Sequence, residues 1–181
     1  MGHLLLLLGC MFAQKTTELL RRIRRYRSIG YEVLVVNYAK DTRYGSNVIA
    51  SHDVDTYKAT CVDKLEEIDT EVRSGKYKVV CLDEGQFFPD LYKYVTTWCD
   101  ELDIHVVVAG LDGDSERKPF GDILKLIPHA EEVERLTAFC SMCKDGTVAT
   151  YSKCFVQKEG QVAVGAGEIY KPVCRKHYLE K

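Results

Sequence analysis

Short, fully apolar runs alternate with segments of helical periodicity along the first two thirds of the chain. The run from Leu4 to Leu8 is apolar at every position, which is typical of a strand buried on both faces. Leu19, Ile23 and Tyr26 then recur at the spacing of one helix face. The same reading predicts strands at residues 3–8, 32–38, 78–82, 105–109 and 132–136, and helices at residues 17–29, 62–73, 90–102 and 122–127.

This alternation predicts the fold class. Continuous apolar strands separated by helices favour an α/β fold, in which a parallel sheet is covered by helices on both faces. The loops that follow the carboxyl ends of such strands are expected to build the active site. A segment rich in charges and hydroxyl groups, at about residues 39–56, is expected to be a polar loop.

Composition narrows the class of protein. The 181 residues are 46% hydrophobic and 29% charged, with a net charge of −2, which predicts a globular chain with a sizeable core and no membrane segment. The first apolar run is too short for a signal peptide or a membrane span. Five arginines within residues 21–27 could form a nucleic-acid-binding helix, but the acidic balance elsewhere favours a solvated face or a subunit contact.

A candidate phosphate-binding loop links the first expected strand to the first expected helix. Backbone N–H groups and the helix dipole converge in such a loop on the phosphates of a nucleotide. Lys15 would reach the β- and γ-phosphates, and the Thr16 hydroxyl would bind Mg²⁺. The pattern matches at Gly9, Lys15 and Thr16, whereas Gln14 stands where a second glycine is expected. An ordinary strand–turn–helix corner is the alternative interpretation.

Two adjacent carboxylates support the phosphate-loop interpretation. Asp83 and Glu84 follow the short apolar run at residues 79–82. A carboxylate at the end of a parallel strand, beside a phosphate loop, is where nucleotide-bound Mg²⁺ needs a ligand. Asp83 could hold the metal and its water shell, and Glu84 could act as a base toward the substrate. The alternative is a solvated acidic turn that closes the strand.

The last forty residues carry the pattern of a zinc ribbon. Cys140 and Cys143 form one pair of candidate ligands, and Cys174 and His177 form another after 30 intervening residues. Four protein ligands leave no position for a substrate, so the zinc would be structural and would stabilise a segment too small for a large core. Strands are expected at residues 147–155 and 161–165, with a turn at 158–160. A disulfide with stray residues is the alternative.

The other four cysteines lack the regular spacing of a disulfide framework, which favours a reducing compartment.

Ordered motifs along nearly the whole chain resemble those of the type II thymidine kinases. These enzymes occur in vertebrate cytosol, bacteria and large DNA viruses. The matching segments are residues 11–12, 15–19, 38–44, 51–53, 83–90, 111–113, 117–121 and 136–138, together with the Cys/His pairs. The resemblance implies a P-loop nucleotide-binding α/β domain at residues 1–138 and a zinc-binding lasso domain at residues 139–181.

The resemblance also implies roles for individual residues. Glu84 would be the general base that deprotonates the 5′-hydroxyl of deoxyribose, Asp83 and Thr16 would serve Mg²⁺, and Asp41 and Arg43 would line the reaction centre. The phosphates of ATP would be held by Gly9, Met11, Phe12, Ala13, Gln14, Lys15, Thr16 and Thr17. The thymine base would be held by Met11, Phe87, Leu111, Phe120, Ser152 and Tyr170, with the lasso residues Val162, Val164 and Gly165.

The expected activity is the ATP-dependent phosphorylation of thymidine, or also of deoxyuridine, to its monophosphate in nucleotide salvage. The implied cofactors are Mg²⁺ and structural Zn²⁺, and the implied assembly is a cytoplasmic homotetramer (in the host cytoplasm if the chain is viral) with feedback binding of dTTP. No nucleic-acid partner is expected.

Several residues depart from the family pattern. Cys10 and Gln14 replace its proline and second glycine, and Ser115, Ser152 and Cys154 bear on nucleoside selectivity. If position 14 needs a positive φ, Gln14 would strain the loop by about 1–3 kcal/mol. The alternative function is a weakened nucleotide-binding or regulatory homologue with little kinase activity.

Overall fold

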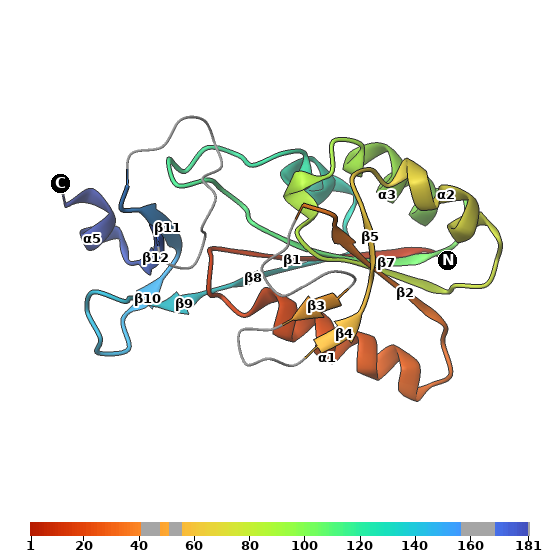
Figure 1. The fold of residues 1–181 in the computed structure, drawn as a ribbon, viewed down its shortest axis with the longest axis horizontal. Helices are drawn as coiled ribbons and strands as arrows, with labels where there is room; N and C mark the ends of the chain where they lie inside the picture. The colour runs from red at the N-terminus through yellow and green to blue at the C-terminus, as the bar shows by residue number, and fades with distance from the viewer. Residues whose placement is uncertain (41–47, 51–55, 157–168, 181) are drawn as a thin grey trace.

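A six-stranded parallel sheet forms the centre of the molecule (Figure 1). The computed structural model describes residues 1–40, 48–50, 56–156 and 169–180. The strand order is β5-β2-β6-β7-β1-β8. Their bounds are β1 (His3–Gly9), β2 (Val33–Tyr38), β5 (Thr60–Val62), β6 (Val79–Leu82), β7 (His105–Gly110) and β8 (Glu132–Leu136). The five strands expected from the sequence are thus confirmed, and β5 is an addition.

Helices cover both faces of this sheet, as the hydrophobic pattern predicts. Because side chains alternate along a strand, Leu5 and Leu7 of β1 pack on one face with Leu19 and Ile23 of α1 (Lys15–Ser28). Leu4, Leu6 and Leu8 pack on the other face with the buried residues of α2 (Glu66–Arg73), α3 (Leu91–Asp100) and the 3₁₀ helix η2 (Ile123–His129). In Figure 1, α1 lies on one side of the sheet and α2 and α3 lie on the other.

Three elements differ from the expectation. The helix expected at residues 62–73 begins only at Glu66, because Thr60–Val62 pairs with the end of β2 as β5. The helix expected at residues 122–127 is the 3₁₀ helix η2, which contains Pro128, a residue without an N–H for helical bonding. The expected polar loop contains a hairpin of β3 (Val48–Ala50) and β4 (Thr56–Lys58), whose Ile49 packs in the cluster with α1.

The C-terminal segment forms two small sheets at one end of the central sheet (Figure 1). Strand β9 (Ala138–Phe139) pairs with β10 (Val148–Ala149), and β11 (Tyr151–Cys154) pairs with β12 (Tyr170–Val173). A short helix, α5 (Arg175–Leu179), follows. The strand expected at residues 147–155 is therefore two strands, and the one expected at residues 161–165 lies outside the described residues. Cys140, Ala149 and Val173 form a small buried cluster of their own.

No helix in the described part of the chain has both the length and the apolar character that a membrane span needs.

Candidate active site

The candidate phosphate loop joins β1 to α1 at the carboxyl end of the sheet. A Cβ atom on Gly9 would lie 2.3 Å from the carbonyl oxygen of Leu136 on β8, so only glycine fits there. Gln14 is the N-cap of α1 and adopts φ 59° and ψ 32°. The position of the missing second glycine therefore does require the left-handed conformation that glycine adopts without strain.

Lys15 and Thr16 begin α1 and make defined contacts. The Lys15 amine donates a hydrogen bond to the Cys10 carbonyl oxygen across the loop (2.7 Å). Burial lowers the pKa of Lys15, while the nearby carboxylate of Glu84 opposes that shift. The Thr16 hydroxyl donates to Asp83 Oδ2 (2.9 Å). This contact brings the start of α1 to the end of β6, as the two sequence motifs require if they act together.

Asp83 is buried, with 5% of its surface exposed. Desolvation, and next the charge of Glu84, raise the pKa of the Asp83 carboxyl to about 7 from the usual 3.8. A buried carboxylate beside a hydroxyl offers the oxygen ligands that Mg²⁺ prefers. A bound cation would also stabilise the charged carboxylate that burial disfavours. The residues present therefore fit a magnesium ion.

Glu84 follows Asp83 and opens the 3₁₀ helix η1 (Gly85–Phe87) in a left-handed conformation, with φ 54°. Its N–H donates to Asp83 Oδ1 (3.0 Å). Its carboxylate accepts a hydrogen bond from Gln86 Nε2 (2.6 Å), and Gln86 Oε1 accepts from the Leu111 N–H (2.9 Å). Sequence reasoning gave Gln86 no role. Its place two residues after Glu84, within a matching motif, is the signal that could have identified it.

Aromatic residues of the predicted base pocket lie together. The rings of Phe87 and Phe120 meet edge to face with centroids 5.3 Å apart, and Tyr38 stacks on Phe87 at 5.2 Å. Tyr38 is an addition to the predicted pocket, and it comes from the end of β2. Tyr170, another predicted member, is buried at the start of β12. Planar rings of this kind suit the face of a nucleobase.

The C-terminal sheets contact the phosphate loop directly. The Met11 N–H donates to Ser152 Oγ on β11 (2.9 Å), and the Cys10 thiol donates to the Ala149 carbonyl oxygen (3.5 Å). These contacts place two predicted substrate residues, Met11 and Ser152, side by side. Asp41 and Arg43, and also Val162, Val164 and Gly165, lie outside the described residues.

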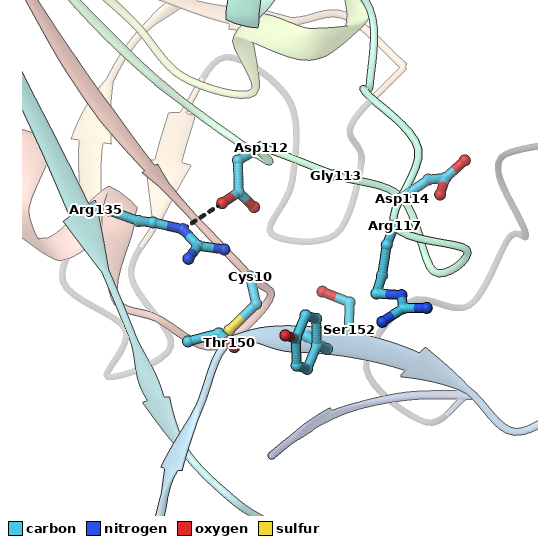
Figure 2. Close-up of a pocket in the computed structure, with 9 residues that line it drawn as sticks. Cys10, Asp112, Gly113, Asp114, Arg117, Arg135, Thr150 and Ser152 are labelled. Atoms are coloured by element: carbon cyan, nitrogen blue, oxygen red, sulfur yellow. Dashed lines mark hydrogen bonds and ion pairs between the residues drawn. The ribbon is translucent and has the colours of Figure 1, made fainter. Parts of the chain in front are cut away.

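A polar cavity of about 110 Å³ lies between the phosphate loop and the C-terminal sheets. Figure 2 shows an ion pair at one edge of it, where Arg135 of β8 donates to Asp112 (2.7 Å). The loop after β7 supplies Asp112 to Asp114 and Arg117, and β11 supplies Tyr151 and Ser152. The cavity is therefore lined by the phosphate loop, β8, β11 and the loop after β7.

The four predicted zinc ligands converge on one point. Their ligand atoms all lie within 4.8 Å of one another. His177 Nδ1 is 3.4, 3.3 and 3.4 Å from the sulfur atoms of Cys140, Cys143 and Cys174, and the last two sulfurs are 3.8 Å apart. Ligands of a tetrahedral zinc site, with Zn–S of about 2.3 Å and Zn–N of about 2.0–2.1 Å, lie about 3.5–3.8 Å apart. The cluster therefore fits zinc.

Comparisons with known proteins agree with this geometry. A sequence profile described as thymidine kinase matches residues 2–178. The thymidine kinase of rabbit fibroma virus (strain Kasza) is 41% identical over 182 residues, which cover 98% of this chain and 97% of that protein. The thymidine kinase of vaccinia virus (strain Western Reserve) is 38% identical over 179 residues, with 99% and 98% covered. The similarity thus extends from the phosphate loop through the Cys/His cluster.

Proposed function

The chain belongs to the thymidine kinase family, and on that premise we propose that it transfers the γ-phosphoryl group of ATP to the 5′-hydroxyl of thymidine. The product is dTMP, formed for nucleotide salvage. The observation that supports this best is the contact between Thr16 and Asp83, which joins the phosphate loop to the acidic pair. The phosphate loop follows β1 and the acidic pair follows β6, with β7 between these two strands in the sheet. The contact therefore brings the proposed phosphate cradle to the proposed metal ligand and base, as phosphoryl transfer requires.

The phosphate loop holds ATP in this proposal. Its phosphate-binding residues are Gly9, Met11, Phe12, Ala13, Gln14, Lys15, Thr16 and Thr17. Lys15 adds a positive charge that stabilises the γ-phosphoryl group during transfer. Thr16 and Asp83 would hold Mg²⁺, which would neutralise phosphate charge.

Glu84 is the general base in this proposal. Its carboxylate accepts the proton of the 5′-hydroxyl as the hydroxyl oxygen attacks the γ-phosphorus, and ADP leaves. Asp41 and Arg43, by resemblance, complete the reaction centre. Glu84 directly follows Asp83, and its charge acts on the Asp83 carboxyl, so the proposed base lies close to the proposed metal ligand.

In this proposal the nucleoside lies against the aromatic residues of the site. Phe87 and Phe120 hold the flat base, with Met11, Leu111, Ser152 and Tyr170, and with the lasso residues Val162, Val164 and Gly165. The hydrogen bond between Met11 and Ser152 supports a shared boundary between the phosphate and nucleoside subsites.

The C-terminal segment is structural in this proposal. Zinc, held by Cys140, Cys143, Cys174 and His177, stabilises a separate domain at residues 139–181, and residues 1–138 form the nucleotide-binding domain. The proposal extends, by family resemblance, to a cytoplasmic homotetramer and to feedback binding of dTTP.

The proposed function is tested by measuring ADP release with thymidine as the acceptor, for the parent chain and for Glu84→Gln. An amide keeps the shape of the side chain but cannot accept the proton, so kcat should fall by about 10²–10⁴-fold. Nucleoside binding should be largely retained. Glu101→Gln, which changes an exposed carboxylate at the end of α3, is the matched control and should keep the parent's kcat.

Two results would contradict this proposal. A parent chain that binds ATP and thymidine but releases no ADP would favour the weakened regulatory homologue. A Glu84→Gln variant within about tenfold of the parent's kcat would remove Glu84 from the role of base.

A further inference from the structure

We propose that Gln86 is a positioning residue for phosphoryl transfer, which orients the Glu84 carboxylate and ties it to the nucleoside side of the site. The inference rests on the proposed function, because it needs Glu84 to act as the base. It adds a residue to which neither the motifs nor the family resemblance assigned a role.

Both the nitrogen and the oxygen of the Gln86 amide form hydrogen bonds. Nε2 donates to Glu84 Oε2 (2.6 Å), and Oε1 accepts from the Leu111 N–H (2.9 Å). The side chain is 3% exposed, so water cannot replace either bond. The partners also fix the orientation of the amide, because a flipped group would set its N–H against the N–H of Leu111 and its oxygen against a carboxylate oxygen.

Two neighbouring backbone segments pack closely against Gln86. A Cβ atom on Gly110, the last residue of β7, would lie 2.5 Å from Gln86 Oε1. A Cβ atom on Gly121, at φ 58°, would lie 2.1 Å from the Gln86 carbonyl oxygen. Two glycines therefore let neighbouring segments approach the residue so closely that they enclose it. A side chain held in this way can act as a rigid support for its partners.

Glu84 needs such a support. Its backbone turns left-handed directly after β6, and its carboxylate must keep one orientation to act as a base. A hydrogen bond to one carboxylate oxygen fixes the plane of the group, and so fixes the direction of the lone pairs on the other. A general base works only when those lone pairs point at the proton that it removes.

The bond to Leu111 gives Gln86 a second effect. Leu111 directly follows β7 and belongs to the proposed nucleoside pocket. Gln86 therefore connects the base with the peptide on which the nucleoside rests. The two ends of one amide should then have separable consequences, one for the rate of transfer and one for nucleoside binding.

Two variants of similar size separate the effects of the two ends of the Gln86 amide. Gln86→Met removes both hydrogen bonds and adds no charge. Gln86→Glu keeps an oxygen that can accept from the Leu111 N–H, but it sets a second carboxyl group against Glu84. Two such groups in a buried site share a proton, which weakens Glu84 as a base. We expect kcat to fall about 10- to 100-fold in both variants, a part of what base catalysis contributes. The KM for thymidine should rise about two- to tenfold in the Met variant only, and the KM for ATP should stay within about twofold of the parent's.

The melting temperature of each variant shows whether it is folded at the assay temperature, so that kcat refers to folded protein. A merely structural role would lower the melting temperature and leave kcat per folded molecule unchanged, and that result overturns the proposal. An equal rise of the thymidine KM in both variants overturns the link to Leu111. If one variant does not fold, the kcat of the other still tests the hydrogen bond between Gln86 and Glu84. A parent chain that releases no ADP with thymidine overturns the proposed function, and the role of Gln86 with it.

Discussion

Single residues at the strand ends carry most of the chemistry, and Gln14 is the one that departs furthest from expectation. Its φ of 59° is a conformation that glycine adopts freely and that costs other residues of order 1–3 kcal/mol. The chain therefore keeps the geometry of a phosphate loop with a residue that does not favour it. The sequence predicted this strain only for the case that position 14 has a positive φ, because the residue type alone does not determine the backbone angle.

Gln14→Gly should lower the KM for ATP by at most about tenfold, or leave it unchanged if the loop has adapted to glutamine. Glycine relieves the backbone strain and removes a side chain from beside the phosphates. ATP titration at saturating thymidine measures the effect. Gln14→Ala is the control, since alanine removes most of the side chain but keeps the strained backbone. A clearly raised KM in the glycine variant would show that Gln14 contributes to nucleotide binding.

The buried carboxyl of Asp83 predicts a pH dependence of stability. Because burial raises its pKa in the folded chain to about 7, the folded state binds more protons than the unfolded state between about pH 4 and pH 7. The contribution of Asp83 to the free energy of unfolding should therefore fall as the pH rises through that range.

Denaturant unfolding in magnesium-free buffer measures this effect, with Asp83→Asn as the comparison because the amide does not titrate. The stability of the parent relative to the variant should be lower at about pH 7 than at about pH 5. Added Mg²⁺ and ATP should reduce the loss for the parent, since a cation stabilises the carboxylate. A relative stability that rises with pH would show that Asp83 is charged in the folded chain without a metal.

At the scale of elements, strand β11 links the C-terminal sheets to the phosphate loop. The Met11 N–H donates to Ser152 Oγ, and loss of an acceptor for a partly buried N–H costs about 1–3 kcal/mol. Ser152→Ala should therefore loosen the loop and raise the KM for ATP by about two- to tenfold.

Ser152→Thr is the matched control for this link, because threonine keeps the hydroxyl and should keep the KM for ATP near that of the parent. Steady-state titration of each substrate at saturation of the other separates the two subsites. If Ser152→Ala changes only the KM for thymidine, Ser152 belongs to the nucleoside pocket alone and the link to the loop has no functional effect.

The elements that the sequence predicted correctly are those with long or uniform patterns. Leu4 to Leu8 and the stripe at Leu19 and Ile23 identify a buried strand and its covering helix without ambiguity. The 3₁₀ helix at Ile123–His129 contains Pro128, and β3 and β4 are only three residues long each, so helical or strand periodicity could not reveal them. Gln86 was missed because its bond to Leu111 exists only once β6 and β7 are adjacent.

At the scale of the whole molecule, a residue beside the Cys/His cluster connects the C-terminal segment to the proposed nucleoside site. Tyr178 directly follows the ligand His177, and its hydroxyl donates to the Ser115 carbonyl oxygen (2.8 Å). The Arg117 guanidinium lies 4.6 Å from the centre of the Tyr178 ring. Both contacts reach the loop after β7, which carries Leu111 and Phe120. The Cys/His cluster and the proposed nucleoside pocket are thus joined by a few residues.

Zinc should be present at about one atom per chain, and His177→Ala should weaken both zinc retention and thymidine binding. A closed site that loses one of its four ligands loses binding energy that is also folding energy, and the contacts of Tyr178 with the nucleoside loop are lost with it. Metal analysis of protein purified without chelators measures the first effect, and calorimetric titration with thymidine measures the second. Cys61→Ser is the matched control, because Cys61 lies on β5 outside the cluster and its replacement should change neither quantity. Protein without zinc would refute the metal site, and normal thymidine binding by His177→Ala would refute its coupling to the pocket.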